Sequence, residues 1–376
     1  MHANLHHRLQ LSLQKLQRAR IRLILAGILA SILASLTAAC DTTEVPVYTT
    51  QFPAFGTAVD LSIVGIQRER AAAAAADVER DLLFFERALY ANNAGHILRI
   101  NEQLARGEPF AAPPSLIPLL IRSQTLFTES DGLFNPAIGR FTRLWGLDHT
   151  HPASETPPGQ AAINALLAVR PTMDDLYLDG LLLQSDNPAV QLDFDAVATA
   201  YAMDVAMDAL RVQSVRSALI NIGGDVRAIG SRSGRAWRLP VPRASGTGVI
   251  GILNVSGDAS LFTASSHARN FVYRGAVYHS VIDPRTGRPA DAAASVSVLH
   301  EGDALTAAAA ANALMIAGPQ DWPRIAARMG IRYALLIDNA GQLQLTPAMA
   351  ERIELLDTKV EQIIRVPPED EPPSTP

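Results

Sequence analysis

Residues 278–289 read Tyr-His-Ser-Val-Ile-Asp-Pro-Arg-Thr-Gly-Arg-Pro, a short apolar strand that runs directly into a turn. Pro284 restricts Asp283 to an extended conformation, and Gly287 supplies a turn position without a Cβ. The Asp283 side chain can accept a hydrogen bond from the backbone two residues on, and Arg285 offers a planar fork that suits phosphate or carboxylate. Taken alone, the stretch is equally consistent with a stiff structural turn and with a ligand-binding turn.

The composition allows a large folded core and argues against nucleic-acid binding. Of the 376 residues, 48% are hydrophobic and 18% are charged, and the formal net charge is −5. Residues 1–39 are basic and hold no acidic residue, so the remainder of the chain is more acidic still. An acidic protein lacks the basic face that binds nucleic-acid phosphates. The sequence also lacks a Walker motif and the His-Glu-x-x-His and Cys-x-x-Cys spacings of zinc sites.

The N-terminus has the plan of a secretion signal. A basic start precedes an apolar run at residues 23–36, which is shorter than the about 20 residues that span a membrane. Small residues at 37–39 then precede Cys40, the only cysteine. The arrangement resembles a bacterial lipobox, with a signal peptide at 1–39, a lipidated Cys40 and a tether at 40–51. It predicts a cell-membrane lipoprotein that faces the periplasm; the alternative is an ordinary signal peptide or an uncleaved anchor.

The order of elements predicts a single compact α+β body at residues 52–364, with mixed and antiparallel sheets and flanking helices, before a disordered tail at 365–376. Helices and strands do not alternate as they do in a parallel βαβ sheet. We expect strands at 56–65, 176–183, 189–194 and 217–222, and helices at 68–90, 114–130, 196–210, 304–316 and 322–329. Asp195 is expected to cap the helix at 196–210.

A second motif, Asn-Ile-Gly-Gly-Asp at residues 221–225, leaves a strand through two glycines. Paired glycines let a backbone approach a ligand closely, and their N–H groups can form an anion-binding concavity. A β-bulge or a tight hairpin is the alternative interpretation of the same residues.

The order and spacing of these motifs resemble one known family. Six stretches carry the resemblance: Gly56-Thr57, Phe-Asn-Pro-Ala-Ile-Gly at 134–139, Leu192-Asp193, the Gly-Gly-Asp stretch at 221–227, Val-Ile-Asp-Pro-Arg-Thr-Gly at 281–287 and an Ala-rich helix at 306–314. Across nearly all of residues 52–345, the chain resembles the FAD:protein FMN transferase (ApbE) family.

The resemblance implies an outward-facing protein that binds FAD. With Mg²⁺, it would cleave the FAD pyrophosphate and attach FMN to a Thr or Ser of a partner, a flavoprotein subunit of a membrane electron-transfer complex. The site residues that it implies are His279, Ser280 and Asp283 for catalysis; Gly56, Thr57, Asn135, Thr199, Gly223, Gly224, Asp225, Arg285 and Thr286 for FAD; and Ala196, Ala308 and Asn312 for the metal.

The chain departs from the family pattern at several of these positions. The family has Asp-Pro where this chain has Asn135-Pro136, a Lys where Thr199 stands, and a His, the expected base, where Ser280 stands. On the Ala-rich helix, a metal-binding Asp and Thr are replaced by Ala308, which has no side-chain oxygen, and Asn312, which could ligate through its amide carbonyl.

Two neighbouring residues could compensate only if the local structure is irregular. Asp303 reaches the metal only if the helix starts later than expected, and His279 reaches the place of the base only through a bulge, because successive strand residues face opposite ways. Two hypotheses follow: an FMN transferase with a rebuilt metal site, or a catalytically degenerate flavin-nucleotide-binding lipoprotein that serves as an assembly factor for a membrane redox complex.

Overall fold

The computed structural model describes residues 45–90, 95–148, 156–244, 247–267, 269–356 and 362–365. Residues 46–376 form one compact unit, and the preceding residues are a separate one. The predicted signal peptide and Cys40 lie outside the described residues, as does the predicted tail apart from Arg365. Among the helices that the structure describes, none is both long and apolar enough to cross a membrane.

Within the described residues, the central sheet has nine strands. Their order is β1 (Val47–Ala54), β2 (Thr57–Val64), β6 (Ser217–Ile222), β7 (Asp225–Ile229), β10 (Ala259–Ser265), β15 (Ala293–His300), β16 (Tyr333–Asp338), β17 (Leu343–Leu345) and β19 (Gln362–Ile364). Neighbouring strands are antiparallel, except that β17 and β19 run parallel. Together with the helices, this sheet confirms the predicted α+β class.

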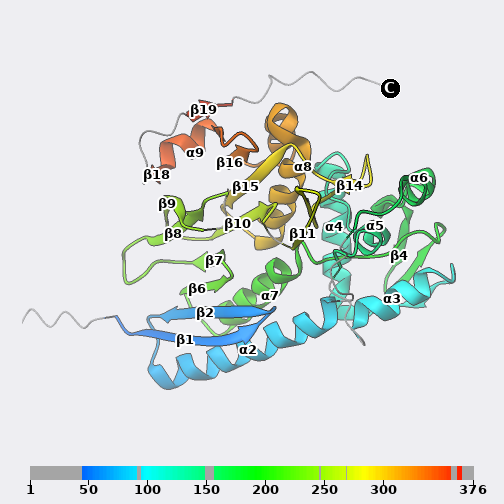
Figure 1. The fold of residues 1–376 in the computed structure, drawn as a ribbon. Coiled ribbons are helices and arrows are strands. Elements are labelled where there is room, and N and C mark those ends of the chain that lie inside the picture. The colour runs from blue at the N-terminus through cyan, green and yellow to red at the C-terminus, as the bar shows by residue number, and fades with distance from the viewer. Residues whose placement is uncertain are drawn as a thin grey trace, which may run out of the picture. The chain divides into compact units, whose positions relative to one another are not determined.

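Three long helices cover one face of the sheet. These are α2 (Arg68–Leu89), α7 (Ala198–Val212) and α8 (Ala304–Arg328); α2 packs on β1, α8 packs on β10 and β15, and α7 lies against both helices (Figure 1). Alternate strand residues such as Phe262 and Leu336 face these helices in the main core. Alanine dominates the contact surface of α8, which lets the helix approach the sheet closely.

The opposite face of the sheet carries a second, smaller layer. It comprises the sheet β8 (Trp237–Pro242), β9 (Val249–Val255) and β18 (Ile353–Leu355), together with α9 (Pro347–Arg352). The residues that alternate with those of the main core, such as Leu261 and Leu335, pack here against Trp237 and Leu253. Successive side chains of each central strand point to opposite faces of the sheet, so each strand contributes to two separate cores.

Shorter elements beside the helical layer complete the body. They are α3 (His96–Leu104), η1 (Pro114–Leu116), α4 (Ile117–Glu129), α5 (Gly139–Leu144), α6 (Gln160–Val169) and η2 (Met173–Asp175), the small sheet β3 (Phe110–Ala111), β5 (Leu182–Ser185) and β4 (Leu176–Asp179), and the hairpins β11 (Asn270–Tyr273)–β12 (Ala276–His279) and β13 (Ile282–Asp283)–β14 (Arg288–Pro289). A third apolar cluster, built around Phe141, Trp145 and Ile282, joins α5 to the β13–β14 hairpin.

The turn between β13 and β14 is a packed structural turn. The Asp283 carboxylate accepts the Arg285 N–H at 2.8 Å, the Asx turn that the sequence predicts. Gly287 has φ +63°, and a Cβ at this position would lie 2.4 Å from Cε1 of Phe141. Trp145 donates its indole N–H to the Gly287 carbonyl at 2.8 Å. The glycine is therefore required both by its left-handed backbone and by the aromatic ring against it.

Several predicted elements differ in the structure. Residues 189–194 do not form a strand of a sheet. Gln191 forms a single β-bridge to Ile138, in which its backbone N–H and carbonyl are both hydrogen-bonded without a continuous strand pair. The strand expected at 176–183 is a hairpin, because Gly180 turns the chain between β4 and β5. The helix expected from 196 begins at Ala198 with Val197 as its N-cap, and no side chain, including that of Asp195, caps it.

One predicted boundary also moves. The predicted tether at 40–51 is too long, because β1 begins at Val47 and pairs with β2 along its whole length. The helices expected at 304–316 and 322–329 are both present, as the two parts of α8 on either side of the non-helical Gly318 (φ 73°).

Candidate active site

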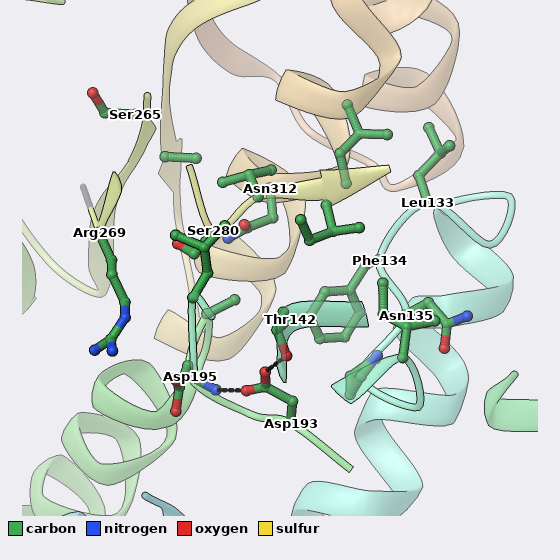
Figure 2. Close-up of a pocket in the computed structure, with 18 of the residues that line it drawn as sticks. Leu133, Phe134, Asn135, Thr142, Asp193, Asp195, Ser265, Arg269, Ser280 and Asn312 are labelled. Atoms are coloured by element: carbon green, nitrogen blue, oxygen red, sulfur yellow. Dashed lines mark hydrogen bonds between the residues drawn. The ribbon is translucent and has the colours of Figure 1, made fainter. Parts of the chain in front are cut away.

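A cavity of about 300 Å³ opens where several parts of the fold meet. Its walls come from the loop after α4, the segment before α7, the end of β10 with the loop that follows, and the start of the β13–β14 hairpin, with α8 above (Figure 2). Polar lining residues are Asn135, Thr142, Asp193, Asp195, Thr263, Ser265, Arg269, Ser280 and Asn312; apolar ones include Phe134, Ile138, Leu147, Val281 and Ile316. An apolar wall with a few convergent polar groups is the usual form of a small-molecule site.

The cavity brings together four of the residues that the sequence singled out. Asn135, Ala196, Ser280 and Asn312 come from four distant segments and all line it. Asn135 is buried and holds its loop, because its amide donates to the Pro171 carbonyl at 3.0 Å and its oxygen accepts the Ala137 N–H at 3.1 Å.

The glycine motifs lie at another place. Gly56 and Thr57 line a separate depression beside the β1–β2 hairpin. Gly223 and Gly224 form the β6–β7 turn, where a Cβ on Gly223 would lie 3.5 Å from the Thr57 methyl group. The Asn221 side chain accepts the Gly224 N–H at 3.0 Å. The structure therefore shows the tight hairpin and does not bring these predicted FAD-binding residues to the cavity.

Asp225 contacts the cavity only through a lining residue. It does not line the cavity, but its carboxylate accepts the backbone N–H of Thr263, which does, at 3.1 Å. Burial raises the pKa of Asp225 to about 7, and the hydrogen bond from Thr263 only partly opposes this rise. Asp225 thus fixes the strand that carries Thr263.

His279 does not line the cavity. Its side chain is buried, at 3% exposure, and one ring nitrogen lies 2.7 Å from the Ala290 carbonyl. Burial lowers the pKa of His279, which favours the neutral ring. No bulge turns it toward the position of Ser280, so the predicted catalytic histidine is held in the protein interior.

The remaining predicted residues of the Asp-Pro-Arg-Thr-Gly turn also lie outside the cavity. The Arg285 fork is bonded to the Asp283 carboxylate, with N–O distances of 2.8 to 3.2 Å, and reaches the Ile316 carbonyl at 3.2 Å. Thr286 accepts the Arg288 N–H at 3.3 Å. Through Arg285 the turn supports the cavity wall at Ile316, and its own side chains do not line the cavity.

The positions implied for Mg²⁺ do not fit that ion. Ala308 is 2% exposed and does not line the cavity, and Ala196, which does, has no side-chain oxygen. Thr199 on α7, which the resemblance implies for FAD, does not line the cavity either. Asn312 donates its amide to the Ala308 carbonyl at 3.1 Å, so the set offers one amide oxygen and no carboxylate. Asp303 cannot replace the lost ligand, because it caps α8 by accepting from Thr306 N and Oγ1, each at 2.7 Å. The described residues contain no group of three or more His, Cys, Asp or Glu side chains that could hold a metal.

The charged lining residues are Asp193, Asp195 and Arg269, and none of them is among the site residues that the resemblance implies. Asp193 accepts from the Thr142 hydroxyl at 2.5 Å and from the Asp195 N–H at 3.0 Å. Burial raises the pKa of Asp195 well above its usual range, the charges of Asp193 and Asp148 add to the rise, and Arg269 opposes it. Asp195 follows the Leu192-Asp193 stretch, whereas Arg269 belongs to none of the quoted motifs, and only the tertiary fold places the two at one cavity.

The chain matches the sequence model described as the ApbE family over residues 55–335. It is 36% identical to a FAD:protein FMN transferase of Rhodobacter capsulatus over 316 residues, which are 84% of this chain and 60% of that protein. It is 28% identical to a FAD:protein FMN transferase of Vibrio cholerae over 226 residues, which are 59% of this chain and 66% of that one. The chain thus spans less than two thirds of the length of these relatives.

Solved structures agree with the fold. The apo form of the Pseudomonas stutzeri flavinyl transferase ApbE superimposes with a TM-score of 0.71 and 26% identity, over 83% of this chain and 98% of that one. The ApbE protein of Thermotoga maritima gives a TM-score of 0.72 at 24% identity, over 79% of this chain and 96% of that one. From the sequence match and the shared architecture together, the chain belongs to the ApbE family.

Proposed function

We propose that the protein is a flavin transferase that takes FAD as its substrate and attaches FMN to a hydroxyl group of a partner flavoprotein. The observation that carries this proposal is the convergence of Asn135, Ala196, Ser280 and Asn312 on one cavity. Asn135 and Asn312 lie within two of the stretches by which the sequence resembles flavin transferases, and Ala196 and Ser280 lie beside two others. The relatives named above carry the same activity in their names.

The reaction is a phosphoryl transfer. The oxygen of an acceptor Thr or Ser attacks the phosphorus of the FMN half of FAD, the pyrophosphate P–O bond breaks, AMP leaves, and the hydroxyl proton passes to solvent. Such a step needs mainly positioning and charge stabilisation, because its transition state is loose. Ser280 can hydrogen-bond a phosphate oxygen, but a hydroxyl group is no base near neutral pH.

The cavity can orient the two halves of the substrate. Phe134, Ile138 and Val281 supply apolar surface for a ring, whereas Thr263, Ser265 and Asn312 supply hydrogen-bonding groups for the phosphates. Asp193 is tied to Thr142 and to the Asp195 N–H, which keeps the segment before α7 in place. This segment includes Ala196, so its geometry is fixed before a ligand arrives.

We further propose that the mature protein is a lipoprotein that is anchored through Cys40 and acts at the periplasmic side of the membrane. The basic start, the apolar run at 23–36 and the single cysteine support this location. A membrane anchor would bring the enzyme to a flavoprotein subunit of a membrane electron-transfer complex, the partner class that we propose.

Intact-protein mass spectrometry of an acceptor flavoprotein tests the function. Incubated with FAD and this protein, the acceptor should gain the mass of one covalently bound FMN, and AMP should appear in equal amount. Ser280→Trp, which fills the cavity, should abolish the transfer. Ala276→Trp, on the exposed side of β12, is the matched control and should leave it unchanged.

The same assay separates the alternative function. Ala308 and Ser280, at positions where the family carries a metal ligand and a base, favour a flavin-nucleotide-binding assembly factor. That protein would bind FAD in the cavity and leave the acceptor mass unchanged. FAD binding without a mass increase, across several acceptors, would therefore replace the transferase with the assembly factor.

A further inference from the structure

The cavity lacks the metal ligands that the family pattern implies, yet it holds a guanidinium group. We propose that Arg269 binds and neutralises the FAD pyrophosphate, so that this chain binds the nucleotide without a divalent cation. The inference deepens the proposed function by naming the residue that recognises the phosphates. It rests on that function, because it assumes that the nucleotide occupies this cavity.

The charge inventory of the cavity points to Arg269. Of its described lining residues, Arg269 is the single cation, and Asp193 and Asp195 are the two acids. Asp193 is satisfied by a hydroxyl and a backbone N–H, whereas Asp195 interacts electrostatically with Arg269. Figure 2 shows the Arg269 side chain extending from the Ser265 side of the cavity toward Asp195. An incoming phosphate can therefore take the place of Asp195 as the counterion.

The backbone of Arg269 is held in place by the same wall. Its carbonyl accepts the Ser280 N–H at 3.0 Å, which ties the loop after β10 to the start of the β13–β14 hairpin. Ser266 donates its N–H to the Ala294 carbonyl at 2.9 Å, and Asn270 begins β11, where it pairs with His279. Arg269 and Ser280 are thus fixed relative to each other at the cavity, which favours a pre-formed phosphate site.

A guanidinium group can bind and neutralise phosphate without a metal ion and its ligands. Its planar fork forms paired charge-assisted hydrogen bonds to phosphate oxygens, and it stays protonated throughout the physiological pH range. On α8, Ala308 has no side-chain oxygen and its carbonyl accepts from the Asn312 amide, and Asp303 is committed to the helix cap. The uncharged polar side chains of the lining, Asn312 and Thr263 among them, can add hydrogen bonds but no positive charge.

The test is calorimetric titration of the full-length chain with FAD, once in EDTA and once with Mg²⁺. We expect dissociation constants that agree within about threefold in the two conditions. Arg269→Gln should weaken FAD binding about 10-fold to 100-fold, because the variant loses the charge-assisted hydrogen bonds to the phosphates. Arg269→Lys keeps the charge without the planar fork, so its affinity for FAD should lie between those of the wild type and of Arg269→Gln. Arg274→Gln, at the tip of the β11–β12 hairpin, is the matched control and should bind as the wild type does.

Riboflavin, which has no phosphate, is the second probe. Its affinity should be the same for the wild type and for Arg269→Gln, which shows that the variant is folded and that the effect is on phosphate recognition. FAD binding that appears only with Mg²⁺, or an Arg269→Gln variant with wild-type FAD affinity, would overturn the inference and leave the transferase function standing. An absence of FAD binding in both conditions would overturn both.

Discussion

Gly287→Ala probes the turn on which the cavity wall is built. The residue has φ +63°, and an added Cβ would lie 2.4 Å from Cε1 and 2.9 Å from Cδ1 of Phe141. A left-handed backbone costs an alanine about 1 to 2 kcal/mol, and overpacking a filled core costs about 1 to 3 kcal/mol more. The free energy of unfolding should therefore fall by about 2 to 5 kcal/mol.

Gly180→Ala is the matched control for the backbone contribution. Gly180 has φ +58°, and nothing lies within 4 Å of its added Cβ. Equilibrium urea unfolding of both variants should show that Gly287→Ala loses about 1 to 3 kcal/mol more than Gly180→Ala, the steric part alone. Equal losses in the two variants would refute the claim that Phe141 packs against this glycine.

Three further variants test other parts of the account. Trp145→Phe removes the indole donor to the Gly287 carbonyl and should cost about 1 to 3 kcal/mol in urea unfolding; a smaller loss would mean that water replaces the bond. The pKa of Asp225 is raised from 3.8 to about 7, so the folded state binds a proton more tightly than the unfolded state does. The stability that this group contributes should therefore be fully present below about pH 4 and lost as the pH rises through 7. Asp225→Asn should flatten that slope in thermal unfolding scans, and an unchanged slope would contradict the assignment. Cys40→Ser should leave the precursor unprocessed or move the protein out of the membrane fraction, and unchanged fractionation would exclude the lipid anchor.

The regular parts of the fold are well predicted by local pattern. The strand at 217–222 and the helix that begins at residue 68 follow their alternation and helical periodicity, because each buries one face on the same core. Residues 189–194 alternate in the same way but form no strand of a sheet. Alternation records which side chains are buried, and Gln191 meets a loop partner, Ile138, instead of a second strand.

The candidate site is only half predictable for a related reason. Asn135, Ala196, Ser280 and Asn312 could be selected because they lie in or beside recognisable motifs, and the fold brings them to one cavity. Arg269 carries no local signal, since its position depends on the contact between the loop after β10 and Ser280. Gly223 and Gly224 are the opposite case: they form a motif, yet they do not reach the cavity. A pair of glycines suits a hairpin turn as well as a ligand-binding loop, so the sequence alone does not distinguish the two.

Where the nucleotide lies is the question on which the whole account depends. A crystal structure of the protein with FAD answers it most directly. We predict that the pyrophosphate lies in the cavity beside Ser280 and Asn312, within hydrogen-bonding distance of Arg269 and with no metal ion bound to it. A pyrophosphate at the Gly56–Thr57 and Gly223–Gly224 edge, or one held by a metal with Arg269 turned away, would contradict the account.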